Sequence, residues 1–175
     1  MPIKMKFISA VLLFCLCSAK VTPTGHKLNW ISIGTLKEKM QSNPRPVLID
    51  LYTNWCYWCK VMDKKTYSNE KVIAYINDHF YAVKVDAETK DSIAWGNRVF
   101  KYNESYKIND FAMFLTSGQP GFPTTSIFTD EKTDPASLEG FLEPRDLEPV
   151  LKYFGEGFSK SESFQAFNAS FKATW

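Results

Sequence analysis

The sequence has few cysteines, only two histidines, little net charge and no apolar run long enough to cross a bilayer. Its longest apolar run, residues 7–17, falls short of the roughly 20 residues that a membrane helix needs. The 21 basic residues nearly balance the 19 acidic ones, which argues against nucleic acid as a partner. The sequence contains no repeat or low-complexity stretch, and its 45% apolar residues suffice for one core. These features favour a single globular domain.

The first residues have the layout of a secretory signal peptide, with Lys4 and Lys6 before the apolar run. Small residues at Cys17 and Ala19 supply the positions that signal peptidase reads, so we expect cleavage after Ala19. Residues 1–19 are then the signal peptide. The remaining protein is expected in the periplasm or secreted, without stable insertion in the membrane.

The four cysteines fall into two groups. Cys15 and Cys17 lie in the expected signal peptide, where an uncleaved anchor or a lipid attached through one of them remains an alternative. The expected domain, residues 20–175, keeps only Cys56 and Cys59. An exported protein that uses cysteine as a structural staple usually carries several separated pairs. One isolated pair, two residues apart, therefore indicates a working dithiol.

Short apolar runs alternate with helical patterns along the chain, which predicts an α/β fold. Val47–Tyr52 is a nearly continuous apolar run, typical of a central strand covered on both faces. Further strands are expected at Leu28–Trp30, Phe80–Val85, Thr124–Phe128 and Ser137–Phe141. Helices are expected at Thr35–Met40, Lys60–Lys65, Ser68–Asp78, Asn109–Leu115 and Asp146–Phe154.

A long segment, residues 87–122, separates two of these strands. Within it, Ile93–Trp95 and Val99–Tyr102 flank a turn and predict a β-hairpin. Whether this insertion covers the edge of the sheet or selects partners is left open by the sequence, since inserted loops often carry recognition.

The C-terminal part shows a helix-start pattern. Ser159 and Glu162 form a capping box ahead of regularly spaced aromatic residues. These are Phe164, Phe167 and Phe171. The pattern predicts an extra amphipathic helix packed on the domain.

The paired cysteines lie where a strand passes into a helix, a position suited to disulfide exchange. This reaction needs a thiolate that attacks and a second thiol that resolves the mixed disulfide. Cys56 lies at the helix N-terminus, where free N–H groups favour negative charge and lower its pKa. Cys59, one turn later, is expected to be more buried. We assign Cys56 as nucleophile and Cys59 as resolving thiol.

Two alternatives concern the same pair. A zinc site would need His26 and His79, which lack the close pairing expected of a zinc finger. A static structural disulfide would close so small a loop that it would remove little chain entropy from the unfolded state.

The segment Asp50–Lys60 resembles the strand, tryptophan, redox motif and following lysine of the thioredoxin family. Gly121-Phe122-Pro123-Thr124 is similar to the cis-proline loop of that family. Thr66–Ser68 and Lys84–Asp86 further resemble the exported subgroup that includes the C-terminal domain of the membrane electron carrier DsbD. The resemblance covers Val47–Phe154 and implies a central mixed β-sheet flanked by helices.

The resemblance also implies roles for individual residues. Asp50 would be a buried carboxylic acid beneath Cys59, its pKa raised by desolvation, accepting the proton of that thiol. The alternative is an ordinary aspartate at the edge of a strand. Pro123 would be cis and place the backbone of Phe122 against Cys56, where a substrate strand can pair. Trp55 would pack beside the dithiol.

Tyr57 and Trp58 depart from the glycine and proline that thioredoxin has between its cysteines. Neither brings a positive charge to stabilise a thiolate, which favours a reducing over a strongly oxidising protein. We therefore expect a disulfide reductase or electron relay that needs no metal or other cofactor and is a monomer. Its partners would be cysteine-containing proteins and an upstream thiol donor, a membrane reductase. The alternatives are an oxidase or isomerase and a non-catalytic binding module. Substrate-binding residues are expected to be Trp55, Tyr57, Trp58, Phe122 and Pro123.

Overall fold

The computed structural model describes residues 27–175, which are built around a five-stranded mixed sheet in the order β1-β3-β2-β8-β9. Strands β1, β3 and β2 are parallel, and β8 and β9 run antiparallel to β2 and to each other. Their bounds are Trp30–Ile31 (β1), Val47–Tyr52 (β2), Tyr81–Asp86 (β3), Thr124–Phe128 (β8) and Ala136–Glu139 (β9). The expected signal peptide lies outside the described residues.

Strand β2 forms the centre of the sheet because its side chains are apolar on both faces. Val47, Ile49 and Leu51 enter one core cluster, whereas Leu48 enters the other. Successive side chains of a strand point to opposite faces, so Asp50 lies on the same face as Leu48. This alternation places a carboxyl group inside the second core layer, directly before the cysteines.

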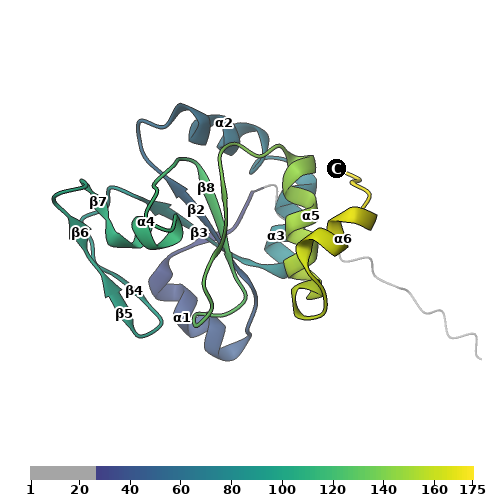
Figure 1. Cartoon of the computed structure of the whole chain (residues 1–175), viewed down its shortest axis with the longest axis horizontal. Coiled ribbons are helices and arrows are strands. Elements are labelled where there is room, and N and C mark those ends of the chain that lie inside the picture. The colour runs from purple at the N-terminus through teal and green to yellow at the C-terminus, as the bar shows by residue number, and fades with distance from the viewer. Residues whose placement is uncertain (1–26) are drawn as a thin grey trace, which may run out of the picture.

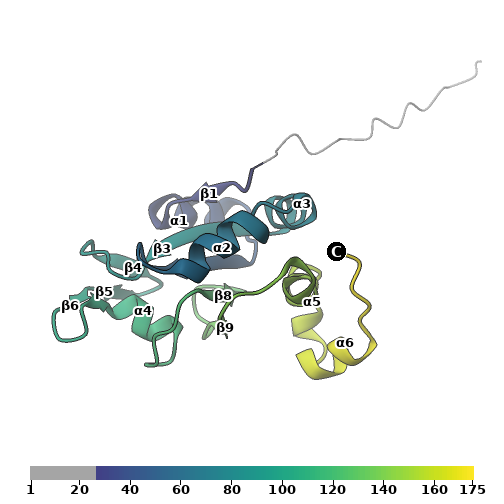
Figure 2. The same cartoon turned by 90° about the horizontal axis from the view of Figure 1, so that it is seen from above.

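Helices cover both faces of the sheet, as Figures 1 and 2 show. Their bounds are Ile33–Ser42 (α1), Tyr57–Lys65 (α2), Glu70–His79 (α3), Asp110–Leu115 (α4), Pro144–Gly155 (α5) and Phe164–Ser170 (α6). Side chains of α1 and α4 join the first core cluster, and those of α2, α3 and α5 join the second. No helix within residues 27–175 is long and apolar enough to pass through a bilayer.

The insertion consists of two small antiparallel hairpins followed by α4. Ile93–Trp95 (β4) pairs with Arg98–Phe100 (β5), as predicted, and Tyr102–Asn103 (β6) pairs with Ile108–Asn109 (β7). The second hairpin was not predicted, because its strands are too short to show alternation. Apolar side chains of β4 and β5 are buried in the first core cluster, so the insertion contributes to the fold. It lies at the opposite end of the molecule from α5 and α6 (Figures 1 and 2).

The tail helix is present, but its predicted cap is wrong. Ser159 belongs to a 3-10 helix, Phe158–Lys160, and α6 is capped by Ser163, whose Oγ accepts a hydrogen bond from the Ala166 N–H at 3.2 Å. The left-handed conformation of Gly157 (φ 80°) leads into the 3-10 turn, which delays the start of the helix. The buried Phe167 packs α6 on the domain.

The end of the chain is tied to a buried carboxylate on α5. Glu148 is 1% exposed and accepts hydrogen bonds from the Thr174 N–H and the Trp175 N–H at 2.6 and 3.0 Å. Its other oxygen accepts from Thr174 Oγ1 at 2.6 Å. Lys71 Nζ donates to the Thr174 carbonyl, and Trp175 packs against Tyr75. Buried polar groups need such partners, so Glu148 and the terminal segment stabilise each other.

Replacing Glu148 by alanine should destabilise the domain by about 1–3 kcal/mol, because the three hydrogen bonds that its side chain accepts are lost. Urea unfolding followed by tryptophan fluorescence measures this loss. Glu162→Ala, which removes an exposed carboxyl group, is the matched control. Equal unfolding midpoints for the two variants would contradict the prediction.

Candidate redox site

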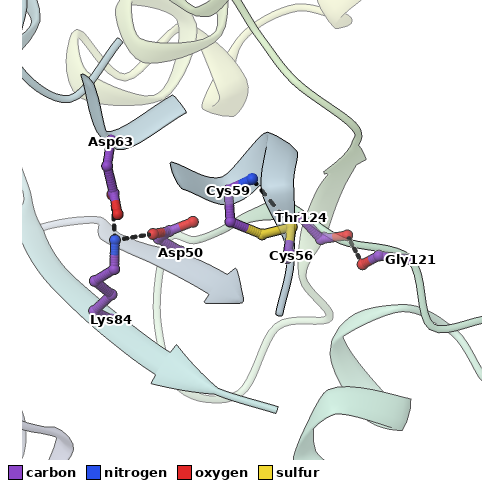
Figure 3. Close-up of a disulfide and its surroundings, with 7 residues drawn as sticks. All are labelled: Asp50, Cys56, Cys59, Asp63, Lys84, Gly121 and Thr124. Carbon is purple, nitrogen blue, oxygen red and sulfur yellow. Dashed lines mark hydrogen bonds and ion pairs between the residues drawn. A yellow bond between two sulfur atoms is a disulfide. The ribbon is translucent and has the colours of Figure 1, made fainter. Parts of the chain in front are cut away.

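Cys56 and Cys59 form a disulfide at the beginning of α2 (Figure 3). Cys56 is the N-cap residue of the helix, and its Sγ accepts a hydrogen bond from the Cys59 N–H at 3.0 Å. The helix begins at Tyr57, earlier than the sequence predicted, so both cysteines lie within its first turn. The free N–H groups of a helix N-terminus stabilise negative charge. Cys56 therefore occupies the position at which a thiolate is most favoured.

The expected difference in burial between the cysteines is absent from the disulfide form. Cys56 is 4% exposed and Cys59 is 3% exposed. Both cysteines are therefore buried to nearly the same extent in this form. An attacking group must reach the pair through the small surface that the two residues leave exposed.

Exposed aromatic side chains lie next to the two cysteines in the chain. Trp55, Tyr57 and Trp58 are 66%, 70% and 55% exposed. Trp55 meets Phe122 edge to face at 5.9 Å between ring centroids, and Trp58 lies 5.7 Å from Phe141. We call these five residues the aromatic rim. Large exposed apolar groups that lie together mark interaction surfaces, because burying them against a partner is favourable.

The loop before β8 completes the surroundings of the cysteines. The Phe122–Pro123 peptide bond is cis, as the resemblance implies, and Pro123 is buried. Thr124 Oγ1 donates a hydrogen bond to the Gly121 carbonyl at 2.9 Å, which ties the loop to the start of β8 (Figure 3). The structure thus brings together the elements predicted from sequence: the end of β2, the start of α2 and the proline loop.

Asp50 is buried on β2 and paired with a lysine that the sequence analysis did not include in the site. Its carboxyl group is 2.9 Å from Lys84 Nζ, which also pairs with Asp63 of α2. In the view of Figure 3, the second Asp50 oxygen is directed toward Cys59. Burial raises the pKa of Asp50 to about 6, although the nearby Lys84 lowers it and Asp63 raises it slightly. A carboxyl group with this pKa can take up and release a proton near neutral pH.

Lys84 lies among aromatic rings as well as carboxylates. Its Nζ is 5.3, 5.1 and 6.0 Å from the ring centroids of Trp30, Tyr52 and Tyr67. Burial lowers the pKa of Lys84, but its two acidic partners raise it above its ordinary value, so the lysine is charged. A lysine between two buried valines of strand β3 was the sequence signal for this contact. Pairing it with Asp50 required the register of β2 and β3.

The structure gives no support to the zinc alternative from the residues that it describes. Within residues 27–175 no three His, Cys, Asp or Glu side chains form a group that could hold a metal ion. His79 stacks on Tyr75 at 4.2 Å between ring centroids, at the end of α3. His26 lies outside the described residues.

Comparison with known proteins shows to which family the chain belongs. The model of the family Thioredox_DsbH, described as a protein of unknown function (DUF255), matches residues 24–151. The chain belongs to this family. The match includes both cysteines, Asp50, Lys84 and the cis-proline loop.

The curated relatives of this Thioredox_DsbH protein are much longer than the chain itself. An uncharacterized protein of Caenorhabditis elegans is 28% identical over 116 residues, which is 66% of this chain and 14% of the relative. The thiol:disulfide interchange protein DsbD of Campylobacter jejuni is 25% identical over 130 residues, which is 73% of this chain and 20% of the relative. The chain therefore spans at most 20% of the length of these two relatives.

Solved structures confirm the predicted fold. A thioredoxin-fold protein from Helicobacter pylori superimposes with a TM-score of 0.54 at 17% identity, covering 71% of this chain and 83% of that one. A DsbH oxidoreductase gives a TM-score of 0.52 at 16% identity, covering 74% and 85%. The protein thus has the thioredoxin fold, belongs to the Thioredox_DsbH family and carries a pair of cysteines joined in a disulfide.

Proposed function

We propose that this Thioredox_DsbH protein reduces disulfides of other proteins, or relays electrons to them, outside the cytoplasm. The observation that carries the proposal is the position of Cys56. Its sulfur caps α2 and is joined to Cys59, and the neighbouring side chains of Trp55, Tyr57 and Trp58 are exposed. The signal-peptide pattern supports export. The named DsbD relative supports thiol–disulfide interchange as the reaction class.

The reaction proceeds in two exchanges. The Cys56 thiolate attacks one sulfur of a client disulfide, so that a bond between Cys56 and the client forms while the client disulfide breaks and releases a thiolate. Cys59 then loses its proton to Asp50 and attacks Cys56, which forms the Cys56–Cys59 disulfide and releases the second client thiolate. Two electrons pass from the dithiol to the client. An upstream thiol donor, for which we propose a membrane reductase, restores the dithiol, and no metal or other cofactor takes part.

The charges beside the cysteines favour the reducing direction. A disulfide protein is a strong oxidant when its reduced form is stabilised, as by cations near the thiolate. Tyr57 and Trp58 bring no cation, and the charge of Lys84 is shared between Asp50 and Asp63. We therefore place this protein with reductases and relays rather than with oxidases or isomerases. Trp55, Tyr57, Trp58 and the Phe122–Pro123 backbone would receive the client.

The reduction potential tests the direction of electron flow. Equilibration with glutathione or dithiothreitol buffers, followed by the fluorescence of Trp55 and Trp58, should give a potential below about −200 mV. A value near −120 mV, like that of a strong oxidase, would contradict the reductase proposal. If the pair equilibrates with neither buffer, the non-catalytic binding module is favoured, because that role does not require exchange.

A further inference from the structure

Two carboxylates stand beside the aromatic pair formed by Trp55 and Phe122. Glu88, in the turn after β3, accepts a hydrogen bond from Trp55 Nε1 at 3.0 Å. Glu139, at the end of β9, lies against Gly121, and its carboxyl group occupies the space that a Cβ atom there would need. Each carboxylate is therefore in contact with a member of the aromatic pair or with its immediate neighbour in the chain.

Neither carboxylate is neutralised by a basic side chain. Within residues 27–175 no Lys, Arg or His forms an ion pair with Glu88 or Glu139. Asp86 adds a third carboxylate to the same turn, where its oxygens accept hydrogen bonds from Asn54 and from the Glu88 N–H. Thus none of these three carboxylates forms an ion pair with a basic side chain within residues 27–175.

The basic residues of this region lie elsewhere. Lys90 follows Glu88 closely, but its Nζ lies 5.2 Å from the centroid of the Tyr102 ring in the insertion. Lys60, Lys64 and Lys65 are exposed on α2, beyond the first turn that holds the cysteines. The exposed lysines of α2 therefore belong to a different element from the carboxylates beside Trp55 and Phe122.

We infer that the Trp55–Phe122 side selects clients that carry lysine or arginine next to the reacting cysteine. This inference deepens the proposed function and rests on it. A cation over an exposed indole ring is attracted by the ring, and a neighbouring carboxylate adds to that attraction. A partner segment that crosses Phe122 to reach Cys56 would bring its flanking side chains to this place. The side chain favoured there is a cationic one.

Three synthetic peptides test the preference. Each contains one intramolecular disulfide and differs only in the residue beside the reacting cysteine, which is Lys, Gln or Glu. The protein is reduced beforehand, and formation of the Cys56–Cys59 disulfide is followed by tryptophan fluorescence after mixing. At low salt we expect the Lys peptide to react about 3- to 10-fold faster than the Gln peptide, and the Glu peptide to react more slowly. At 1 M salt the difference should shrink, because charges are screened.

Two variants that each remove one negative charge test whether Glu88 and Glu139 cause the preference for the Lys peptide. Glu88→Gln and Glu139→Gln should each lower the preference for the Lys peptide while leaving the rate with the Gln peptide within about twofold. The glutamine oxygen at position 88 can still accept the hydrogen bond from Trp55. Glu104→Gln removes an exposed carboxylate in the turn of the second hairpin and should leave the preference unchanged.

The outcomes separate this inference from the proposed function. If no peptide oxidises the protein, the proposed function fails. If all three peptides react equally fast, the proposed function stands and the charge preference is wrong. A preference that survives both glutamine variants would also overturn the inference, since the selecting charge would then lie elsewhere.

Discussion

Replacing Cys56 by serine should abolish disulfide exchange, with a rate lower than that of the wild-type protein by about three orders of magnitude or more. A serine hydroxyl stays protonated at neutral pH even at a helix N-terminus, so the attacking atom is lost. The measurement is a single turnover of pre-reduced protein with insulin, followed by the appearance of free insulin thiols. Cap formation by serine keeps α2 folded, so far-ultraviolet circular dichroism should be unchanged.

Cys59→Ser is the matched control for this result. Its Cys56 can still attack, but no second thiol resolves the mixed disulfide, so the covalent complex with insulin should accumulate and be visible on a non-reducing gel. If Cys56→Ser instead accumulated the complex and Cys59→Ser did not, the two cysteines would have the reverse roles. Exchange that persists in both variants would refute the site.

Replacing Asp50 by asparagine should slow the resolving step and at the same time stabilise the fold. Without the carboxylate, Cys59 has no buried acceptor for its proton, and general-base catalysis contributes roughly 10²–10⁴-fold. The rate of mixed-disulfide resolution should fall accordingly and lose its dependence on a group that titrates near pH 6. The measurement is the rate of release of the second client thiol between pH 5 and 8.

The gain in stability follows from the raised pKa of Asp50. Its value rises from 3.8 to about 6 on folding, so the folded protein holds this proton more tightly than the unfolded chain does. The associated stability is fully present below about pH 4 and is lost as the pH rises through 6. The loss amounts to roughly 3 kcal/mol, since each tenfold change in the equilibrium corresponds to about 1.4 kcal/mol. Because asparagine does not ionise, Asp50→Asn does not lose this stability as the pH rises. Lys84 still pairs with Asp63 in the variant.

Urea unfolding of the oxidised protein at pH 4, 5.5 and 7.5 checks the sign of the effect. The advantage of Asp50→Asn over the wild type should grow with pH. Asp134→Asn, at an exposed carboxylate in the loop before β9 that pairs with no basic side chain within residues 27–175, should show no such trend. A variant that is both slower and less stable at pH 7.5 would point to a merely structural role for Asp50.

The local features of the site could be predicted from sequence because each depends on neighbouring residues. The apolar run of β2 and the two cysteines after it form one strand-to-helix unit, and the cis bond at Pro123 follows from the family resemblance. Helix boundaries shifted by a few residues. The wrong cap for α6 arose because Ser159 and Ser163 both precede apolar positions, and only the turn at Gly157 distinguishes them.

The contacts that the sequence did not predict all join distant segments. The pairing of Lys84 with both Asp50 and Asp63 depends on strand register and on where α2 packs. The capture of residues 174 and 175 by Glu148 depends on the path of the chain after α6. Periodicity and spacing cannot predict such contacts, because they describe single helices or strands and not how these elements pack against each other.

The hydrogen bond from the Cys59 N–H to Cys56 Sγ links the shape of α2 to the chemistry of the disulfide. The same N–H group that caps the first turn is placed to stabilise negative charge on the sulfur once the disulfide is reduced. Tyr57 and Trp58 lie between its two ends, so they act as the spacer of this contact as well as part of the surface. Substitutions of these two aromatic residues that change the affinity for clients are therefore expected to change the reduction potential of the cysteine pair as well.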